Sequence, residues 1–214
     1  MDKLIARYPS KPDGDLTLCP EHGVAYQTDM AVTAAYDGEY FDKCAGYKNG
    51  EIARRINMGR AKFVDHHYCP RGPMLDVGVG AGEFIEFRGA GTFGYDINPT
   101  AVEWLKSRGR YRDKLAGWMC YSFWDVIEHV PEPEAYFRNV LQGSRLLTSI
   151  PIFSDLTRIR DSKHYRPGEH LYYFTATGFV DWMASHKFEL LGIETFEMRA
   201  GREDIWSFAF EKVT

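Results

Sequence analysis

Cysteine is scarce in this 214-residue chain, and its four copies are too far apart to form any C-x-x-C pair. Disulfide-rich scaffolds and regular structural zinc sites need denser or repeated spacing, so we expect free thiols in a reducing, cytoplasmic setting. One half-site exists, because Cys19 and His22 stand in the sequence CPEH. With His66, His67 and Cys69 further on they could hold zinc, and the alternative is a turn that buries a cysteine.

Long apolar runs and blocks of one charge are also missing. The longest apolar runs fall far short of the roughly 18 residues that span a membrane, so we expect no membrane partner. The stretch MDKLIARYPSKPDGD contains no apolar core of signal-peptide length, in line with a cytoplasmic location. Lys and Arg number 26 against 30 Asp and Glu, a net charge of −4, which does not favour a nucleic-acid partner.

From residue 72 onward, strand and helix patterns alternate with short connections. The predicted strands are GPMLDVG, TFGYDI, GWMCYSFWDV and SRLLTSIPIF. The predicted helices between them are AGEFIEFRGAG, NPTAVEWLKSRG and PEPEAYFRNVLQG, the second with Asn98 as N-cap and Pro99 in its first turn. Such alternation predicts right-handed β-α-β units and a parallel sheet.

The end of the chain breaks this alternation. After the amphipathic helix TATGFVDWMASHKF come two predicted strands, FELLGIETFEM and EDIWSFAFEKV, joined by the tight RAGR. Strands joined so closely must be antiparallel, because a parallel pair needs a long crossover. The predicted fold class is therefore α/β, with a doubly wound, mostly parallel Rossmann-like sheet in three αβα layers and a C-terminal antiparallel hairpin.

The first third of the chain has a different character. Residues 1–30 predict an irregular lead-in with room for a short hairpin, and 31–48 an aromatic-rich connector or short helices. Residues 50–68 have the apolar stripe of a helix. We therefore predict an N-terminal extension and helical lid over 1–70, followed by one compact domain over 71–214.

Three alternating glycines follow the first predicted strand of that domain, in LDVGVGAGEF. Asp76 precedes Gly78, Gly80 and Gly82, which predicts a sharp turn that lets a ligand approach the backbone. A dinucleotide fingerprint would need glycine where Glu83 stands, and no Gly-Lys-Ser/Thr follows for a phosphate loop. The acids Asp76 and Glu83 favour a positively charged cofactor over a pyrophosphate.

A further acid, Asp96, ends the next predicted strand, 20 residues after Asp76. A carboxylate in this place can accept hydrogen bonds from both ribose hydroxyls of an adenosine group. The two acids together predict a nucleoside cofactor at the carboxyl ends of the first two strands.

These motifs resemble the class I S-adenosylmethionine-dependent methyltransferases, especially the group with the ubiquinone-pathway O-methyltransferases. The resemblance rests on LDVGVGAGEF, GYDINPTAVEWLKSRG, FWDVIEHVPEP and GEHLYYFTATGFVDWMASHKFELL, and covers about residues 72–214. It implies S-adenosyl-L-methionine as cofactor and 71–214 as the domain that binds it. The implied cofactor contacts are Asp76, Gly78, Gly80 and Gly82 for methionine, Asp96 for ribose, Ile97 and Asn98 beside adenine, Trp124 and Asp125 at the next strand end, and Arg60 for the cofactor carboxylate.

The chain departs from that pattern between Asp96 and Asp125. The resembled enzymes usually have another strand and helix there, and the strand commonly ends in an acid that touches the adenine amino group. RGRYRDKLAG leaves little room for a full strand, and Asp113 does not match the spacing. We expect one abbreviated strand in the sheet.

The acceptor side is predicted from DVIEH (125–129) and KHYRPGEHLYYF (163–174). Glu128, His129 and His170 are the candidate catalytic residues, as base or acceptor contacts, because histidine exchanges protons near neutral pH. In the ubiquinone-pathway enzymes a similar cluster can hold a divalent metal, and Asp125, Glu128 and His129 match it by position. Many relatives carry the same letters without a metal, as a turn that starts a helix, and we predict no metal.

The predicted function is transfer of a methyl group from S-adenosylmethionine to a small-molecule nucleophile, with oxygen as the expected acceptor atom. One alternative is a nicotinamide-dependent oxidoreductase, which the glycine spacing opposes. Another is a non-catalytic binding protein with the methyltransferase fold, which the shortened 99–120 region favours. The sequence leaves the acceptor and the oligomeric state open.

Overall fold

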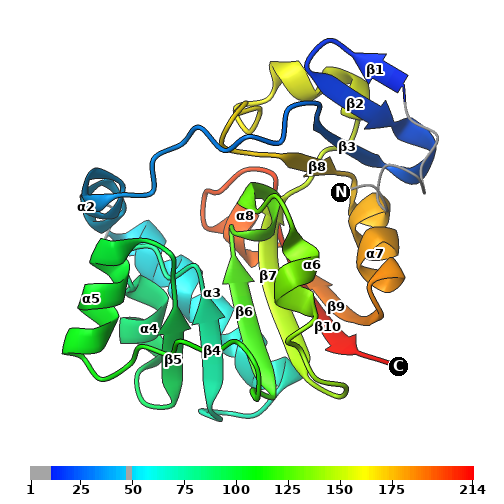
Figure 1. The fold of residues 1–214 in the computed structure, drawn as a ribbon. Helices are drawn as coiled ribbons and strands as arrows, with labels where there is room; N and C mark the ends of the chain where they lie inside the picture. The colour runs from blue at the N-terminus through cyan, green and yellow to red at the C-terminus, as the bar shows by residue number, and fades with distance from the viewer. Residues whose placement is uncertain (1–10, 47–49) are drawn as a thin grey trace.

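The computed structural model describes residues 11–46 and 50–214, and its main sheet has six strands in the order β5-β4-β6-β7-β10-β9 (Figure 1). Neighbouring strands among the first four are parallel, and β10 is antiparallel to both β7 and β9. The prediction of a doubly wound, mostly parallel sheet with a C-terminal antiparallel pair is confirmed. The strands are β4 (Met74–Val77), β5 (Thr92–Tyr95), β6 (Cys120–Trp124), β7 (Arg145–Pro151), β9 (Phe188–Glu194) and β10 (Ile205–Lys212).

Helices cover both faces of this sheet because its strands are apolar on both sides. In β4, Met74 packs toward α3 (Glu51–His67) and α4 (Glu83–Arg88), whereas Leu75 packs into the core on the opposite face. That core includes side chains from α6 (Pro133–Phe137) and α7 (Ala176–Ser185). Burial on both faces is the arrangement typical of parallel sheets.

The sheet edge beyond β5 is abbreviated, as predicted. Helix α5 (Pro99–Ser107) follows β5, and the Asn98 side chain accepts a hydrogen bond from the Thr100 N–H as its N-cap. The next segment then touches β5 through one parallel bridge, between Gly94 and Tyr111. The Gly94 N–H donates to the Arg110 carbonyl and the Arg112 N–H to the Gly94 carbonyl, after which the chain leaves the sheet.

A second, antiparallel sheet lies beyond the main one, with the order β1-β2-β3-β8 (Figure 1). A meander of β1 (Lys11–Asp13), β2 (Leu16–Cys19) and β3 (Val24–Gln27) extends the short hairpin expected in the lead-in. The fourth strand, β8 (Tyr172–Phe174), comes from the segment 163–174 that the sequence places in a loop. The sequence gives no sign of this pairing, because β3 and β8 are about 150 residues apart.

The connection in the C-terminal hairpin also differs from the prediction. The predicted strand FELLGIETFEM ends at Glu194, and α8 (Phe196–Arg199) forms one helical turn before β10. Gly201 follows this turn with φ of +104°, the left-handed conformation that commonly ends a helix. The helical turn carries a buried acid, Glu197, toward the site described below.

The N-terminal connector forms helix α2 (Gly38–Gly46) before α3. Three short 3-10 helices complete the described elements: η1 (Pro20–His22), η2 (Ile127–His129) and η3 (Leu156–Asp161). Tyr47, one of the aromatic residues of the connector predicted over 31–48, lies outside the described residues. In the described part of the chain, no helix is both long and apolar enough to cross a membrane.

Candidate active site

The glycine turn lies at the carboxyl end of β4, and all three of its glycines have positive φ: +72° at Gly78, +53° at Gly80 and +79° at Gly82. A Cβ on Gly78 would meet Val126 at 2.5 Å, and one on Gly82 would meet Trp104 at 2.1 Å. A Cβ on Gly80 would meet nothing within 4 Å. The protein's own packing therefore requires glycine at two positions, and only Gly80 turns its α-carbon toward open space.

This difference predicts losses of stability of different size for two alanine substitutions. Gly82→Ala adds left-handed strain and a clash with Trp104, so we expect a loss of about 3 kcal/mol or more in unfolding free energy. Gly80→Ala adds strain without a clash and should cost about 1 kcal/mol. Urea unfolding of both variants measures the difference, and equal losses would contradict it.

Asp76 is buried beneath the turn, where its Oδ1 accepts a hydrogen bond of 2.6 Å from the Ser122 hydroxyl. Burial raises the pKa of Asp76 to about 7, against the lowering effect of that hydrogen bond. Nearby at the start of α4, Oε1 of Glu83 is buried with no hydrogen-bond partner in the described part of the chain. Two acids beside one turn, one of them with an unpaired oxygen, suit a ligand with hydrogen-bond donors and positive charge.

Asp96 lies one strand away and is tied to the same turn. Its Oδ2 accepts from the Val79 N–H and its Oδ1 from the Asn98 N–H, both at 2.8 Å. Burial raises the pKa of Asp96, although these backbone donors oppose the shift. The Asp96 carboxylate is thus held at the carboxyl end of β5, where the sequence places it. Its contact with a ribose stays a prediction.

The two residues after Asp96 have different environments. Ile97 is 65% exposed, which is unusual for a large apolar side chain and leaves it available to cover a flat ring. Asn98 is buried, and both ends of its amide are occupied: Oδ1 caps α5, and Nδ2 donates to the Asp37 carbonyl at 2.8 Å. The Asn98 side chain thus holds the start of α5 against the Asp37 backbone, whereas the Ile97 side chain is exposed to solvent.

Helix α2 and the connector before it cover this part of the site. Phe41 packs with Val79 of the turn in one small apolar cluster, and Asp37 is the residue bonded by Asn98. The Tyr36 hydroxyl lies 3.1 Å from Nδ1 of His129. The predicted lid segment therefore contacts both the glycine turn and the DVIEH turn.

Asp125, at the end of β6, belongs to a closed ion network with Arg60, Glu197 and Arg202. Arg60 Nη2 donates to Asp125 Oδ2 at 3.0 Å and Arg60 Nε to Glu197 Oε1 at 2.8 Å. Arg202 Nη1 lies 2.8 Å from Asp125 Oδ2 and 2.5 Å from Glu197 Oε2. Burial favours a raised pKa for Asp125, but Arg202 and Arg60 outweigh it and hold the pKa well below its ordinary value.

This network uses two predicted site residues for a structural purpose. The Asp125 backbone has φ of +57°, a left-handed conformation that costs energy outside glycine, and its side chain is fixed by both arginines. The bonds of Arg60 in the described structure go to Asp125, Glu197 and Ser149. A cofactor carboxylate contact by Arg60 stays a prediction.

Trp124 is buried on the α3 and α4 face of the sheet. Its ring packs against Phe84 at 5.4 Å, the Arg60 guanidinium lies 4.9 Å from it, and its Nε1 has no hydrogen-bond partner among the described residues. Trp124 therefore packs against α4, the helix that follows the glycine turn. Its contact with a cofactor stays a prediction.

The three predicted acceptor residues come together on the other side of Asp125. Ligand atoms of Glu128, His129 and His170 all lie within 4.8 Å of one another, and the two imidazole rings are 4.6 Å apart. Burial and the Asp125 charge raise the pKa of Glu128 well above its ordinary value. Burial lowers the pKa of His129, and it lowers that of His170 to about 3, so both imidazoles are neutral near pH 7.

The other polar side chains of segment 163–174 are engaged elsewhere. The His164 Nε2 bonds the Glu203 carbonyl at 2.9 Å, Tyr165 bonds Asp15, and the Tyr172 hydroxyl donates to the Pro131 carbonyl. The CPEH half-site is a hydrogen-bonded pair, with 3.0 Å between Cys19 Sγ and His22 Nδ1. Within the described residues, the possible metal-ligand groups of three or more comprise only Glu128, His129 and His170.

Glu197 and Arg202 are not identified as site residues from the sequence. Arg202 bonds Asp125, and Glu197 bonds Arg60, which is itself a partner of Asp125. A signal for Glu197 existed, because TFEMRAG combines helix-forming residues with a terminal glycine and thus predicts a short helix. For Arg202 no local signal existed, since an arginine in a turn is ordinarily solvated.

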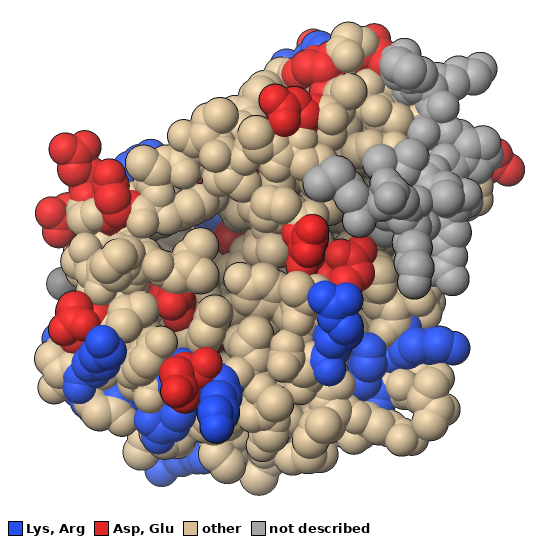
Figure 2. Space-filling view, viewed as in Figure 1, with Lys and Arg blue, Asp and Glu red and all other residues tan. Residues whose placement is uncertain are grey.

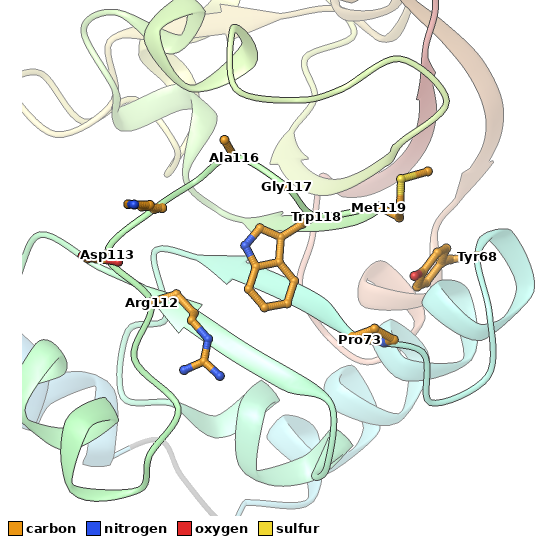
Figure 3. Close-up of a pocket in the computed structure, with 9 residues that line it drawn as sticks. Tyr68, Pro73, Arg112, Asp113, Ala116, Gly117, Trp118 and Met119 are labelled. Atoms are coloured by element: carbon orange, nitrogen blue, oxygen red, sulfur yellow. The ribbon is translucent and has the colours of Figure 1, made fainter.

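A hollow is visible on one face of the molecule. In the space-filling view it opens beneath the segment that precedes α2, with charged atoms inside it (Figure 2). A separate pocket of about 410 Å³ is lined by segment 112–119 with Tyr68 and Pro73, and Trp118 points into it (Figure 3). Its lining contains none of the predicted site residues, and it includes the residues just before β4 and β6, away from the carboxyl ends of the strands.

Comparison with known proteins places the fold. No protein-family model and no curated protein sequence matches the chain. Among solved structures, magnesium protoporphyrin IX methyltransferase from Synechocystis PCC 6803, with bound S-adenosylhomocysteine, superimposes with a TM-score of 0.58 at 14% identity over 82% of this chain and 94% of that one. Burkholderia thailandensis 1,6-didemethyltoxoflavin-N1-methyltransferase gives 0.56 at 16% identity over 89% and 96%. Geranyl diphosphate methyltransferase with S-adenosylmethionine gives 0.55 at 14% identity over 89% and 97%.

These likenesses establish the fold. The chain has the Rossmann-like architecture of class I S-adenosylmethionine-dependent methyltransferases, as the sequence motifs predict. At this level of identity the likeness carries the arrangement of strands and helices, and the activity has to be argued from the site.

Proposed function

We propose that the protein is an S-adenosyl-L-methionine-dependent methyltransferase acting on a small molecule. The observation that carries the proposal is the glycine turn, in which Gly80 faces open space beside Asp76, Asp96 and the unpaired oxygen of Glu83. Solved structures with this fold have S-adenosylhomocysteine or S-adenosylmethionine bound, which supports the same cofactor here.

The residues present fit that cofactor, one part at a time. Asp76 and Glu83 would face its amino group, Gly78, Gly80 and Gly82 would let its methionine part approach the backbone, and Asp96 would hold the ribose. Ile97 would cover one face of the adenine. The bound cofactor supplies an electrophilic methyl group, and the chain's residues hold and orient the reactants.

The acceptor side of the proposal is Glu128, His129 and His170, under Tyr36. Glu128 and His170 are buried and His129 is half-buried, which would limit the access of bulk water to an acceptor bound beside them. As the resemblance to ubiquinone-pathway O-methyltransferases implies, we propose oxygen as the acceptor atom. Structural neighbours act on several kinds of small molecule, including a nitrogen-methylated one, so the acceptor atom needs its own test.

The remaining parts of the proposal concern organisation and location. We propose residues 1–70 as the extension and lid, and 71–214 as the cofactor-binding unit, on the contacts of α2 with the glycine turn. A cytoplasmic location is supported by four cysteines that are all free thiols.

Calorimetry with S-adenosylhomocysteine tests the proposal. We expect binding to the wild type, and a loss of affinity of about tenfold or more for Asp96→Ala, because charge-assisted hydrogen bonds to the ribose are lost. Glu103→Ala is the matched control, since Glu103 is an exposed acid on the neighbouring helix α5.

Absence of binding at about 1 mM ligand, an affinity too weak for a cofactor, would sink the proposal. A thermal shift with NAD and none with S-adenosylhomocysteine would favour the oxidoreductase alternative. Binding without turnover on a panel of hydroxyl and amine acceptors would favour a non-catalytic role.

A further inference from the structure

Two buried side chains and one half-buried side chain, from two separate segments, meet beside the end of β6. Glu128 and His129 belong to η2, and His170 precedes β8 of the second sheet. The Leu171 N–H donates to the Glu128 carbonyl at 2.7 Å, which fixes the two segments against each other. The ligand atoms of the three side chains therefore lie within 4.8 Å of one another as a consequence of the fold.

Three polar atoms of this cluster lack hydrogen-bond partners in the described part of the chain. Among the described residues, neither carboxylate oxygen of Glu128 has a hydrogen-bond partner, and nor does Nδ1 of His170, although all three atoms are buried. The nearest approach is 3.8 Å, from Glu128 Oε1 to His129 Nε2, which exceeds a hydrogen bond. Buried polar atoms without partners are rare in native proteins, and a bound ion or water is one of the usual reasons for them.

The orientation of His129 is already set for a metal. Its Nδ1 lies 2.9 Å from the Glu169 carbonyl oxygen and 3.1 Å from the Tyr36 hydroxyl. Because a carbonyl can only accept, the first contact assigns the proton to Nδ1, and the hydroxyl can accept from the same N–H. The lone pair is then on Nε2, the atom that faces Glu128. Histidines that bind metals commonly donate their other N–H to a backbone carbonyl in this way.

We propose that Glu128, His129 and His170 form a binding site for one divalent transition-metal ion, with zinc as the best match. Two imidazoles and one carboxylate are a zinc-type ligand set, whereas magnesium prefers oxygen ligands alone. Zinc bonds of about 2.0–2.2 Å require the ligand atoms to draw together to roughly 3.4 Å. The second Glu128 oxygen could then accept a hydrogen bond from a water, and a fourth ligand of the ion would be a water or another molecule.

This site differs from the cluster that the resemblance implies. Asp125 cannot join it while its carboxylate bonds both Arg60 and Arg202, and His170 takes its place from another segment. The proposal is independent of the proposed cofactor, because it concerns these three residues and an ion. If the proposed function holds, Glu128, His129 and His170 would hold the ion on the proposed acceptor side, where it would supply Lewis acidity to an acceptor oxygen.

Cobalt(II) is the probe for this site, because its visible absorption reports the number and type of its ligands. We expect the metal-free wild type to bind one equivalent, with a spectrum of nitrogen and oxygen ligation, and zinc to displace it. Zinc should also raise the melting temperature of the wild type, since a ligand that binds only the folded state stabilises it.

Two variants and one control locate the ion. Glu128→Gln keeps the shape of the side chain, and His170→Ala removes one imidazole; each should lower cobalt affinity at least tenfold and abolish the zinc shift. His164→Ala is the matched control, because His164 is another buried histidine whose Nε2 bonds the Glu203 carbonyl and which is not one of the three proposed ligands. Circular dichroism of each variant establishes that it is folded, and Glu128→Gln decides the question if His170→Ala does not fold.

Three outcomes would overturn the proposal: no cobalt bound by the wild type, equal affinity in wild type and Glu128→Gln, or a thiolate charge-transfer band. The last would place the ion at Cys19 and His22 instead. None of these measurements uses S-adenosylhomocysteine, so a failure here and a failure of the proposed function are separate results.

Discussion

Replacement of Glu197 by alanine is expected to lower the free energy of unfolding by about 3–5 kcal/mol. Glu197 is fully buried and bonds both Arg60 and Arg202, so its removal leaves two partly buried arginines, with side chains 12% and 30% exposed, paired with only the Asp125 carboxylate. An uncompensated buried charge is among the most costly defects in a protein interior. Urea unfolding should show a lower midpoint with an unchanged m-value.

A surface variant and a double variant test the reason for this loss. Glu194→Ala removes an exposed acid paired with Arg199 at 3.3 Å, and it should change stability by less than about 1 kcal/mol. In Arg60→Met/Glu197→Met one charge of each sign is removed, so part of the lost stability should return. A Glu197→Ala variant within about 1 kcal/mol of wild type would contradict the prediction.

The network also explains how the chain reaches the acceptor side. Asp125 adopts a left-handed backbone conformation, and its two arginine partners hold the side chain toward α3 and α8. The chain then turns directly into η2, which carries Glu128 and His129 to the opposite side. Loss of Glu197 should therefore loosen the acceptor side as well as the fold.

The sequence was sufficient for the main sheet because its signals are local. Apolar strands, the Asn98 cap and the proline of α5 each act within a few residues, and the structure confirms them. The shortened edge is predicted from the short spacing between Asp96 and Asp125 compared with the pattern of the resembled enzymes, and Tyr111 supplies its single bridge. The glycine turn, too, is a local signal, although only the structure separates Gly80 from the two glycines that packing requires.

Contacts between distant segments could not be predicted in this way. The pairing of β3 with β8 and the arginine network join residues up to about 150 positions apart, and no local pattern encodes such partners. Asp125 illustrates the limit. Its position in DVIEH groups it with Glu128 and His129, whereas long-range charges from Arg60 and Arg202 separate it from them.

Asp76→Asn is expected to stabilise the protein near pH 8 while it weakens cofactor binding. Burial raises the pKa of Asp76 to about 7 from an ordinary value of 3.8, so the folded protein holds this proton more tightly than the unfolded chain. The free energy of unfolding therefore falls as pH rises from about 4 to about 7, and it levels off above that. Asparagine is neutral throughout and can still accept the Ser122 hydrogen bond, which removes this cost.

The expected gain is about 2–4 kcal/mol at pH 8 and close to zero at pH 4, where aspartic acid is itself protonated. Asp161→Asn is the control, because Asp161 is an exposed acid paired with Arg158 and should show no such pH dependence. The same gain at both pH values would contradict the assignment of the cost to the Asp76 charge.

Cofactor binding should respond in the opposite direction. If Asp76 faces the amino group of the cofactor, Asp76→Asn loses a charged hydrogen bond, and calorimetry should show S-adenosylhomocysteine binding weakened about tenfold or more. Stability alone would favour a neutral residue at position 76. A carboxylate that lowers the stability of the ligand-free protein and strengthens ligand binding therefore serves ligand binding. Unchanged affinity would instead leave Asp76 as a buried acid bonded to Ser122, and the cofactor's amino group would then depend on Glu83.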